Sequence, residues 1–141
     1  MKRELEEKLY NDFPVLYAGK DLPETENLMS FGFECSDGWF NLIYELSEKI
    51  TKLDPNVQAF QVKEKFGGLR FYVGVTNNET LDLIEEYEEA SYRTCEKCGS
   101  MDNVAQTTGW VTSLCKTCMD EHLNVKISKS MEKRIKCQKG E

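Results

Sequence analysis

The stretch QVKEKFGGLRFYV, residues 61–73, predicts a β-hairpin in the middle of this 141-residue chain. Apolar and polar residues alternate from residue 57 to residue 75 on both sides of Gly67-Gly68, and a pair of glycines is typical of a two-residue turn between strands. We therefore expect an antiparallel hairpin over residues 57–75, with Gly67 and Gly68 at its tip.

The expected register gives the hairpin one apolar face and one basic face. Pairing across Gly67-Gly68 places four pairs on the first face, which is apolar apart from Glu64: Phe66 with Leu69, Glu64 with Phe71, Val62 with Val73, and Phe60 with Val75. The opposite face pairs Lys65 with Arg70 and Lys63 with Tyr72, and it therefore carries three basic side chains. These residues form either a small basic patch or an ordinary solvated face of the sheet.

A strong amphipathic helix precedes the hairpin. It is expected to begin at Asp37, a good N-cap residue, and to end at Asp54-Pro55. Its apolar stripe repeats every 3.6 residues and contains Trp39, Ile43, Leu46 and Ile50.

Two further helices are expected in the same part of the chain. One is capped by Asn77-Asn78 and runs to about Tyr92, with a stripe of Leu81, Ile84 and Tyr87. The other is short and covers residues 2–10, whereas residues 11–36 are expected to be irregular. Helices packed on a small antiparallel sheet predict an α+β fold, with an acidic α+β domain over residues 1–93.

Four of the six cysteines form the pattern C-x2-C-x16-C-x2-C: Cys95, Cys98, Cys115 and Cys118. This spacing is typical of a structural zinc site, because two tight turns each present two thiolates to one tetrahedral ion. The alternatives are two disulfides or four unrelated thiols, and a reducing cytosol disfavours disulfides. We therefore expect a zinc ribbon with one structural Zn²⁺ over residues 94–141, which also include a basic C-terminal helix and tail.

The other candidate ligands fall outside this pattern. Cys35 is expected to be a small buried side chain, and Cys137 a free thiol in a charged tail. His122 follows Cys118 by one helical turn and could replace a cysteine as a ligand, but with four thiolates present we expect a surface histidine. Four thiolates leave no open coordination position, so the expected metal is structural and not catalytic.

The net charge of −7 comes from the first two-thirds of the chain. Residues 1–94 carry 10 basic and 19 acidic residues, whereas residues 95–141 carry 8 basic and 6 acidic residues. Binding bare nucleic acid through its phosphates requires an excess of Lys and Arg. Direct nucleic-acid binding is therefore not expected of this acidic chain.

Six carboxylates gather on the helix that follows the hairpin, with no Lys or Arg between them: Glu79, Asp82, Glu85, Glu86, Glu88 and Glu89. Like charges at helical spacing repel one another, and a surface built only for solubility normally mixes both signs. We therefore expect these residues to bind a basic partner, with simple solvation of the helix as the alternative.

Motifs for catalysis are absent from the sequence. A single histidine leaves little room for Ser-His-Asp or Cys-His chemistry, and no phosphate-binding glycine loop, HExxH or GxSxG motif occurs. We expect the protein not to be an enzyme. The charged first residues and the lack of a long apolar run predict a soluble, cytoplasmic protein without a signal peptide or membrane helix.

Three strings together give the chain a resemblance to a known family. They are FECSDGWF (residues 33–40), QVKEKFGGLRFYV (residues 61–73), and TCEKCG (residues 94–99) with the Gly109-Trp110 pair and the second cysteine pair that follow. In this order they resemble a family of small zinc-ribbon proteins of phages and prophages, mostly without assigned function. The resemblance covers about residues 31–118. It implies a metal site at the four cysteines and a place of action in the cytoplasm of a bacterial host.

The small, acidic, zinc-binding chain is also similar to the metal-binding anti-CRISPR proteins that inhibit Cas9. This similarity implies that the acidic surface binds the Cas9–guide complex, which holds its nucleic acids in a positively charged channel, and blocks loading of target DNA. The main alternative is a regulator whose ribbon, basic sheet face and basic tail bind DNA or RNA. A module for another host protein is the third possibility. The oligomeric state stays open, with a monomer favoured.

Overall fold

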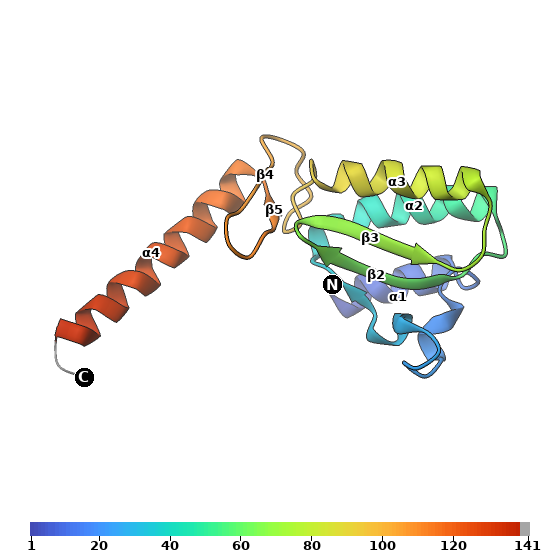
Figure 1. Cartoon of the computed structure of the whole chain (residues 1–141), viewed down its shortest axis with the longest axis horizontal. Coiled ribbons are helices and arrows are strands. Elements are labelled where there is room, and N and C mark those ends of the chain that lie inside the picture. The colour runs from blue at the N-terminus through green and yellow to red at the C-terminus, as the bar shows by residue number, and fades with distance from the viewer. Residues whose placement is uncertain (139–141) are drawn as a thin grey trace.

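A computed structural model of the chain describes residues 1–138, with side chains described to residue 134, and has the expected α+β architecture (Figure 1). Its three-stranded sheet consists of β1 (Phe33–Glu34), β2 (Ala59–Lys65) and β3 (Gly68–Val73). The α-helices are α1 (Arg3–Asp12), α2 (Phe40–Leu53), α3 (Asn78–Ser91) and α4 (Lys116–Gln138). Short 3₁₀ helices occupy Ala18–Asp21, Leu28–Phe31 and Asp37–Trp39. Within this part of the chain, no helix has both the length and the hydrophobicity that crossing a membrane requires.

The hairpin is present, but its register differs from the expected one by two residues. β2 and β3 pair antiparallel with Val62 opposite Phe71, whereas the predicted register places Val62 opposite Val73. The turn lies at Phe66-Gly67, where both residues have positive φ, 54° and 84°, as a type I′ turn requires. Phe66 is consequently 69% exposed at the tip of the hairpin and contributes nothing to an apolar face.

Residue 68, the first of β3, is a glycine because a neighbouring ring packs directly over it. A Cβ at residue 68 would overlap the ring of Tyr92, which directly follows α3. Arg70 holds that ring in place, since its guanidinium donates a hydrogen bond to the Tyr92 hydroxyl at 3.1 Å. Close packing on Tyr92, and not turn geometry, therefore explains this glycine.

A β-bulge changes which side chains at the start of β2 face the core. The register shifts between Ala59 and Gln61, so that Ala59 is buried and Phe60 is 42% exposed. Val75 lies beyond the end of β3 and is fully exposed. The prediction that Phe60 and Val75 lie on the apolar face is therefore wrong.

β1 adds a parallel strand to the sheet within a segment expected to be irregular. Phe33 pairs with Val62 in parallel register. The buried Phe33 ring stacks on Tyr10 of α1 at a centroid distance of 5.6 Å, and its backbone N–H donates to the Glu6 carboxylate at 2.7 Å. Contacts with α1, which is distant in sequence, thus place this strand, so no local pattern indicates it.

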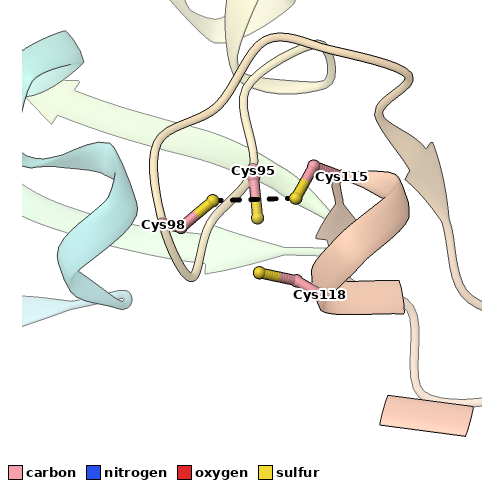
Figure 2. Close-up of side chains that lie close together, drawn as sticks. All are labelled: Cys95, Cys98, Cys115 and Cys118. Atoms are coloured by element: carbon pink, nitrogen blue, oxygen red, sulfur yellow. Dashed lines mark hydrogen bonds between the residues drawn. The ribbon is translucent and has the colours of Figure 1, made fainter. Parts of the chain in front are cut away.

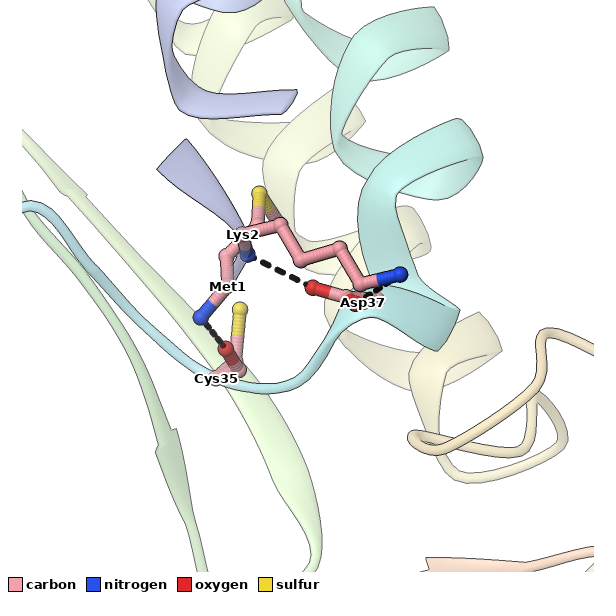
Figure 3. Close-up of polar contacts among 4 residues, drawn as sticks. All are labelled: Met1, Lys2, Cys35 and Asp37. Atoms are coloured by element: carbon pink, nitrogen blue, oxygen red, sulfur yellow. Dashed lines mark hydrogen bonds and ion pairs between the residues drawn. The ribbon is translucent and has the colours of Figure 1, made fainter. Parts of the chain in front are cut away.

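α2 and the 3₁₀ turn before it carry the predicted core stripe, but the helix begins later than expected. All four stripe residues are fully buried: Trp39, Ile43, Leu46 and Ile50. Asp37 lies in the 3₁₀ turn before α2 and is not an N-cap, so that prediction is wrong. Its carboxylate instead accepts a hydrogen bond from the Lys2 backbone N–H at 2.7 Å, and the Met1 amino group donates to the Cys35 carbonyl at 2.8 Å (Figure 3). The start of α1 is thereby held against the segment that leads into α2.

α3 lies beside α2 and along β3, and its predicted cap is confirmed (Figure 1). The Asn77 side chain accepts a hydrogen bond from the Thr80 backbone N–H at 2.8 Å. Leu81 is 48% exposed, so its predicted place in the buried stripe is wrong, whereas Ile84 and Tyr87 are buried as expected. Thr80 takes the inward position at the start of the helix, where its hydroxyl also bonds to the cap.

The four-cysteine segment forms a second, smaller core. Its two short strands, β4 (Ala105–Gln106) and β5 (Ser113–Leu114), are antiparallel, and Leu114 packs with three of the cysteines. α4, the expected C-terminal helix, begins at Lys116 and extends away from the rest of the molecule (Figure 1). Two apolar clusters lie on either side of the predicted boundary between residues 93 and 94, and hydrogen bonds join the two parts of the chain.

Candidate metal centre and interaction surfaces

The four predicted cysteine ligands meet at one point. The Sγ atoms of Cys95, Cys98, Cys115 and Cys118 all lie within 4.8 Å of one another, and those of Cys98 and Cys115 are 3.6 Å apart (Figure 2). A tetrahedral ion with metal–sulfur bonds of about 2.3 Å requires sulfur–sulfur distances of about 3.8 Å. The cluster therefore has the geometry of a four-thiolate metal site, as the spacing predicts.

Two tight turns present these thiolates. In the first, the Gly99 backbone N–H donates to the Cys95 carbonyl at 2.9 Å, and Gly99 has a φ of +84°, which favours glycine. In the second, the Met119 backbone N–H donates to the Cys115 carbonyl at 2.8 Å as α4 begins. Each turn thus aims two side chains at the same point, one pair from a loop and one pair from the start of α4, where Cys115 directly precedes the helix and Cys118 lies in its first turn.

The protein environment favours a thiolate at the innermost ligand. Burial acts to raise the pKa of Cys95, but hydrogen bonds from the backbone N–H groups of Cys115, Cys98 and Lys97 lower this pKa to about 7. Burial and the neighbouring thiols raise the pKa of Cys118. Cys95 and Cys118 thus differ in how readily they ionise, and a divalent cation bound between the sulfurs would stabilise the thiolate form of both.

The site is closed on most sides, and among the residues whose side chains the structure describes no further ligand joins the four cysteines. Cys95, Cys115 and Cys118 are buried, and Cys98 is exposed at the edge. His122 is half-buried one turn after Cys118 and is not part of the cluster. Within the described residues its Nε2 atom is buried without a hydrogen-bond partner. Four protein ligands fill a tetrahedron, so the arrangement is suited to holding the fold together.

Glu96, between the first two ligands, joins the metal centre to the α+β part of the chain. One of its carboxylate oxygens accepts a hydrogen bond from the Ser36 backbone N–H and the other from the Thr112 hydroxyl, each at 3.0 Å. Its backbone carbonyl accepts from the Gly38 N–H at 2.8 Å. Sequence reasoning missed Glu96 and Gly38, because nothing in either segment indicates that the two meet.

Trp39 adds a second bond across the same junction. Its indole Nε1–H donates to the carbonyl of Thr94, the residue before the first ligand, at 2.9 Å. The ring is fully buried and also belongs to the main core. The segment FECSDGWF, residues 33–40, which contributes to the family resemblance, therefore supports the four-cysteine segment through these hydrogen bonds.

Two cysteines, Cys35 and Cys137, fall outside the four-cysteine pattern. Cys35 is buried, as predicted, and burial raises its pKa to about 12, so it is an inert apolar side chain. Cys137 lies beyond the residues whose side chains the structure describes.

Five of the six acidic residues predicted to bind a partner form an exposed face of α3: Glu79, Asp82, Glu85, Glu86 and Glu89. Glu88 is different, because its carboxylate turns toward the sheet and accepts a hydrogen bond from the Phe71 backbone N–H at 2.9 Å. Burial raises the pKa of Glu88. We therefore assign Glu88 to the support of β3 and not to the acidic face, which hereafter means the five exposed carboxylates.

The predicted basic patch is only partly available to a partner. Lys63 and Arg70 are neighbours across the hairpin, but Arg70 donates to Tyr92 and to the Leu69 carbonyl. Lys65 lies with its ammonium 5.7 Å from the centre of the Phe66 ring. The predicted pairings of Lys65 with Arg70 and of Lys63 with Tyr72 are wrong, since Lys65 is opposite Gly68 and Gln61 is opposite Tyr72.

Comparison with known proteins adds no relative to this picture. The chain matches no protein family, no curated protein and no solved structure. Its function is accordingly inferred from the metal centre and the surfaces described above.

Proposed function

We propose that the protein is a non-enzymatic binding protein, stabilised by one structural Zn²⁺, whose acidic face docks on a basic surface of a partner. The observation that carries this proposal is the composition of α3. Five exposed carboxylates lie on this helix, and none of its residues is Lys or Arg. Electrostatic complementarity of this kind speeds association and selects a partner of opposite charge.

A groove beside the acidic face supplies the apolar contacts that a protein partner needs. It lies between α2, α3 and the first cysteine turn, with a volume of about 310 Å³. Leu42 and Met101 line it, and Met101 is 67% exposed. Glu45 of α2 and Glu86 of α3 also line it. An apolar centre surrounded by charged side chains is the usual composition of a protein–protein interface.

Zinc is the metal we infer for the cysteine cluster. Four thiolates in tetrahedral arrangement suit Zn²⁺, which has no preferred geometry of its own and no redox chemistry. Because all four coordination positions are filled by protein, the ion would stabilise the fold and activate no water. The proposal that the protein is not an enzyme rests on this closed centre.

The partner we propose is the Cas9–guide complex, in the cytoplasm of a bacterial host. The support for it is the resemblance to metal-binding anti-CRISPR proteins, together with a net charge of −7 and the acidic face. Cas9 holds guide and target in a positively charged channel, and an acidic helix that occupies or borders this channel would exclude target DNA.

Inhibition of target binding by a preassembled Cas9–guide complex tests this function. The wild-type protein should abolish binding of labelled target DNA, and the triple variant Glu85→Lys, Glu86→Lys, Glu89→Lys should be at least about tenfold weaker. The control is Glu4→Lys, Glu24→Lys, Glu26→Lys, which makes the same charge change at exposed residues far from α3 in sequence. This control should inhibit like the wild type.

Two results would contradict the proposal in different ways. Wild-type protein that leaves target binding intact rejects the Cas9–guide complex as the partner. Equal potency of the α3 triple variant and its control removes the acidic face from the interface, whatever the partner is.

A second candidate function, nucleic-acid binding, is favoured by one observation. Trp110 is 87% exposed, and together with Phe66, Lys63 and Lys65 it lines a hollow of about 300 Å³. Exposed aromatic rings beside lysines are typical of surfaces on which single-stranded bases stack. Glu64 lines the same hollow and opposes phosphate binding. A shift of labelled single-stranded DNA by the protein alone, weakening steeply as salt rises, would favour this candidate.

A further inference from the structure

α4 is a long helix that leaves most of its surface without a partner. Cys115 directly precedes it and Cys118 lies in its first turn, and Lys97 forms an ion pair with Glu121 at 3.1 Å. Beyond this anchor the helix extends away from the other elements (Figure 1). Three apolar side chains on it, Leu123, Ile127 and Met131, are 47%, 58% and 57% exposed.

These three residues form one continuous stripe. They are spaced four apart, and at 100° per residue all lie within about 40° of Ile127 around the helix axis. Asp120 and Arg134 fall on the same side, one beyond each end of the stripe. The stripe faces away from the body, because Glu121, His122 and Val125, on the other side of α4, line the hollow between this helix and Glu96.

An exposed stripe on a projecting helix indicates a missing contact. Most of the stability of a helix in a protein comes from packing an amphipathic face, since isolated helices are marginal in water. Burying side chains such as Leu and Ile removes apolar surface from water and so stabilises the contact that covers them. Within the described residues, neither Asp120 nor Arg134 forms an ion pair.

We propose that the stripe is a dimer interface on which the α4 helix of a second copy of this chain packs in antiparallel orientation. Ile127 is the midpoint of α4, Lys116–Gln138, so a two-fold axis at Ile127 overlaps the helices along their full length. In this register Leu123 lies opposite Met131, and Asp120 lies opposite Arg134. One symmetric contact thus covers all three apolar residues and pairs both charges.

The charges select the antiparallel orientation over the parallel one. A parallel pair in register would place Asp120 against Asp120 and Arg134 against Arg134, and like charges across a helix interface are destabilising. Two-fold pairing converts both contacts into opposite-charge pairs. This inference is independent of the acidic face and of the partner proposed for it.

Sedimentation of the zinc-loaded full chain over a range of concentrations tests the dimer. The wild type should sediment as a dimer at the upper end of the range, and Ile127→Glu, which places two carboxylates at the two-fold axis, should weaken dimerisation at least about tenfold. Val125→Glu is the matched control. Val125 is 53% exposed on another side of the same helix, so this variant should dimerise like the wild type.

Charge exchange tests the register without disturbing the apolar stripe. Asp120→Arg alone and Arg134→Asp alone should each weaken dimerisation, and the double variant should restore it, because the opposite-charge pair is regenerated. Zinc content and circular dichroism verify that each variant is folded. A wild-type protein that stays monomeric at all concentrations, or a dimer indifferent to Ile127→Glu, overturns the proposal. A double variant weaker than both single variants overturns the antiparallel register.

Discussion

The Glu96 carboxylate, between two of the four clustered cysteines, accepts a hydrogen bond from the Ser36 backbone N–H, 60 residues earlier in the chain, at 3.0 Å. Glu96 is buried, and its backbone carbonyl also accepts from Gly38. The loop that carries the first two cysteines is therefore fastened to the segment that leads into α2. A change on either side of this junction should affect both the fold and the metal centre.

Gly38→Ala should destabilise the protein and weaken its hold on the metal. A Cβ at residue 38 would overlap the carbonyl oxygens of Cys95 and Glu96, and backbone atoms cannot move aside as a flexible side chain can. We expect a loss of about 2–3 kcal/mol in the free energy of unfolding. Denaturant unfolding of the zinc-loaded protein measures this loss, and competition with a chromogenic chelator measures metal affinity.

Gly74→Ala is the control for this substitution. The nearest atom to a Cβ at residue 74, the Gln58 carbonyl oxygen, is 3.9 Å away, so the change should stay within about 0.5 kcal/mol of the wild type. Equal stability of Gly38→Ala and Gly74→Ala would contradict the close contact between residue 38 and the carbonyl groups of Cys95 and Glu96.

Removal of the metal should unfold the ribbon and lower the stability of the whole chain. Elemental analysis should find about one zinc per chain, since four thiolates hold one ion. Cys95→Ser with Cys98→Ser should abolish stoichiometric zinc and cost several kcal/mol, because metal binding at such sites is largely folding free energy. Cys35→Ala, a cysteine outside the cluster, should retain one zinc. A metal-free preparation with wild-type thermal stability contradicts the structural role.

The position of the hairpin turn predicts opposite changes in stability for substitutions at Phe66 and Gly68. Phe66 adopts a positive φ that costs a side chain of its kind about 1–2 kcal/mol, whereas asparagine tolerates it and Asn-Gly is a favoured type I′ turn. Phe66→Asn should therefore raise the free energy of unfolding by about 0.5–1 kcal/mol. Gly68→Ala should lower it by about 2 kcal/mol through overlap with Tyr92. A turn at Gly67-Gly68 would reverse the sensitivity of the two positions, and thermal unfolding of both variants decides between them.

Local signals predicted the features of this protein that depend on local physics. The helix periodicity from Trp39 to Ile50 and the Asn77 cap require only neighbouring residues, and the cysteine pattern lies within one segment, residues 95–118; all three are confirmed. The features that were missed depend on contacts between distant segments. The ring of Tyr92 over Gly68 shifts the turn, and the contacts of Phe33 with α1 create β1.

The same distinction between local pattern and tertiary contact applies to the candidate surfaces. The sequence pattern places six carboxylates on α3, but only the tertiary structure shows that the Glu88 carboxylate bonds to the backbone of β3. Likewise the apolar residues of α4 are visible in the sequence, whereas their exposure on a projecting helix is visible only in the fold. A pattern therefore predicts the chemistry of a face, and its availability follows from the neighbouring elements.

Glu88 should behave differently from its neighbours on α3 when each is truncated. Glu88→Ala removes the acceptor of the half-buried hydrogen bond from the Phe71 N–H. It should lower the free energy of unfolding by about 1–2 kcal/mol. Glu85→Ala, at an exposed position of the same helix, should change stability by no more than about 0.5 kcal/mol. Equal effects of the two truncations would place Glu88 with the acidic face after all.

Glu88→Gln separates the hydrogen bond of Glu88 from its charge. The amide oxygen can still accept from Phe71, and the substitution removes a carboxylate whose pKa burial raises above its ordinary value of 4.5. A raised folded-state pKa means that the wild type gains relative stability at low pH and loses it as pH rises through that pKa. The variant should therefore be more stable than the wild type at pH 7, and this advantage should vanish below about pH 4. Urea unfolding at both pH values measures the difference, and a variant that is less stable at pH 7 would show that the charge itself supports the bond.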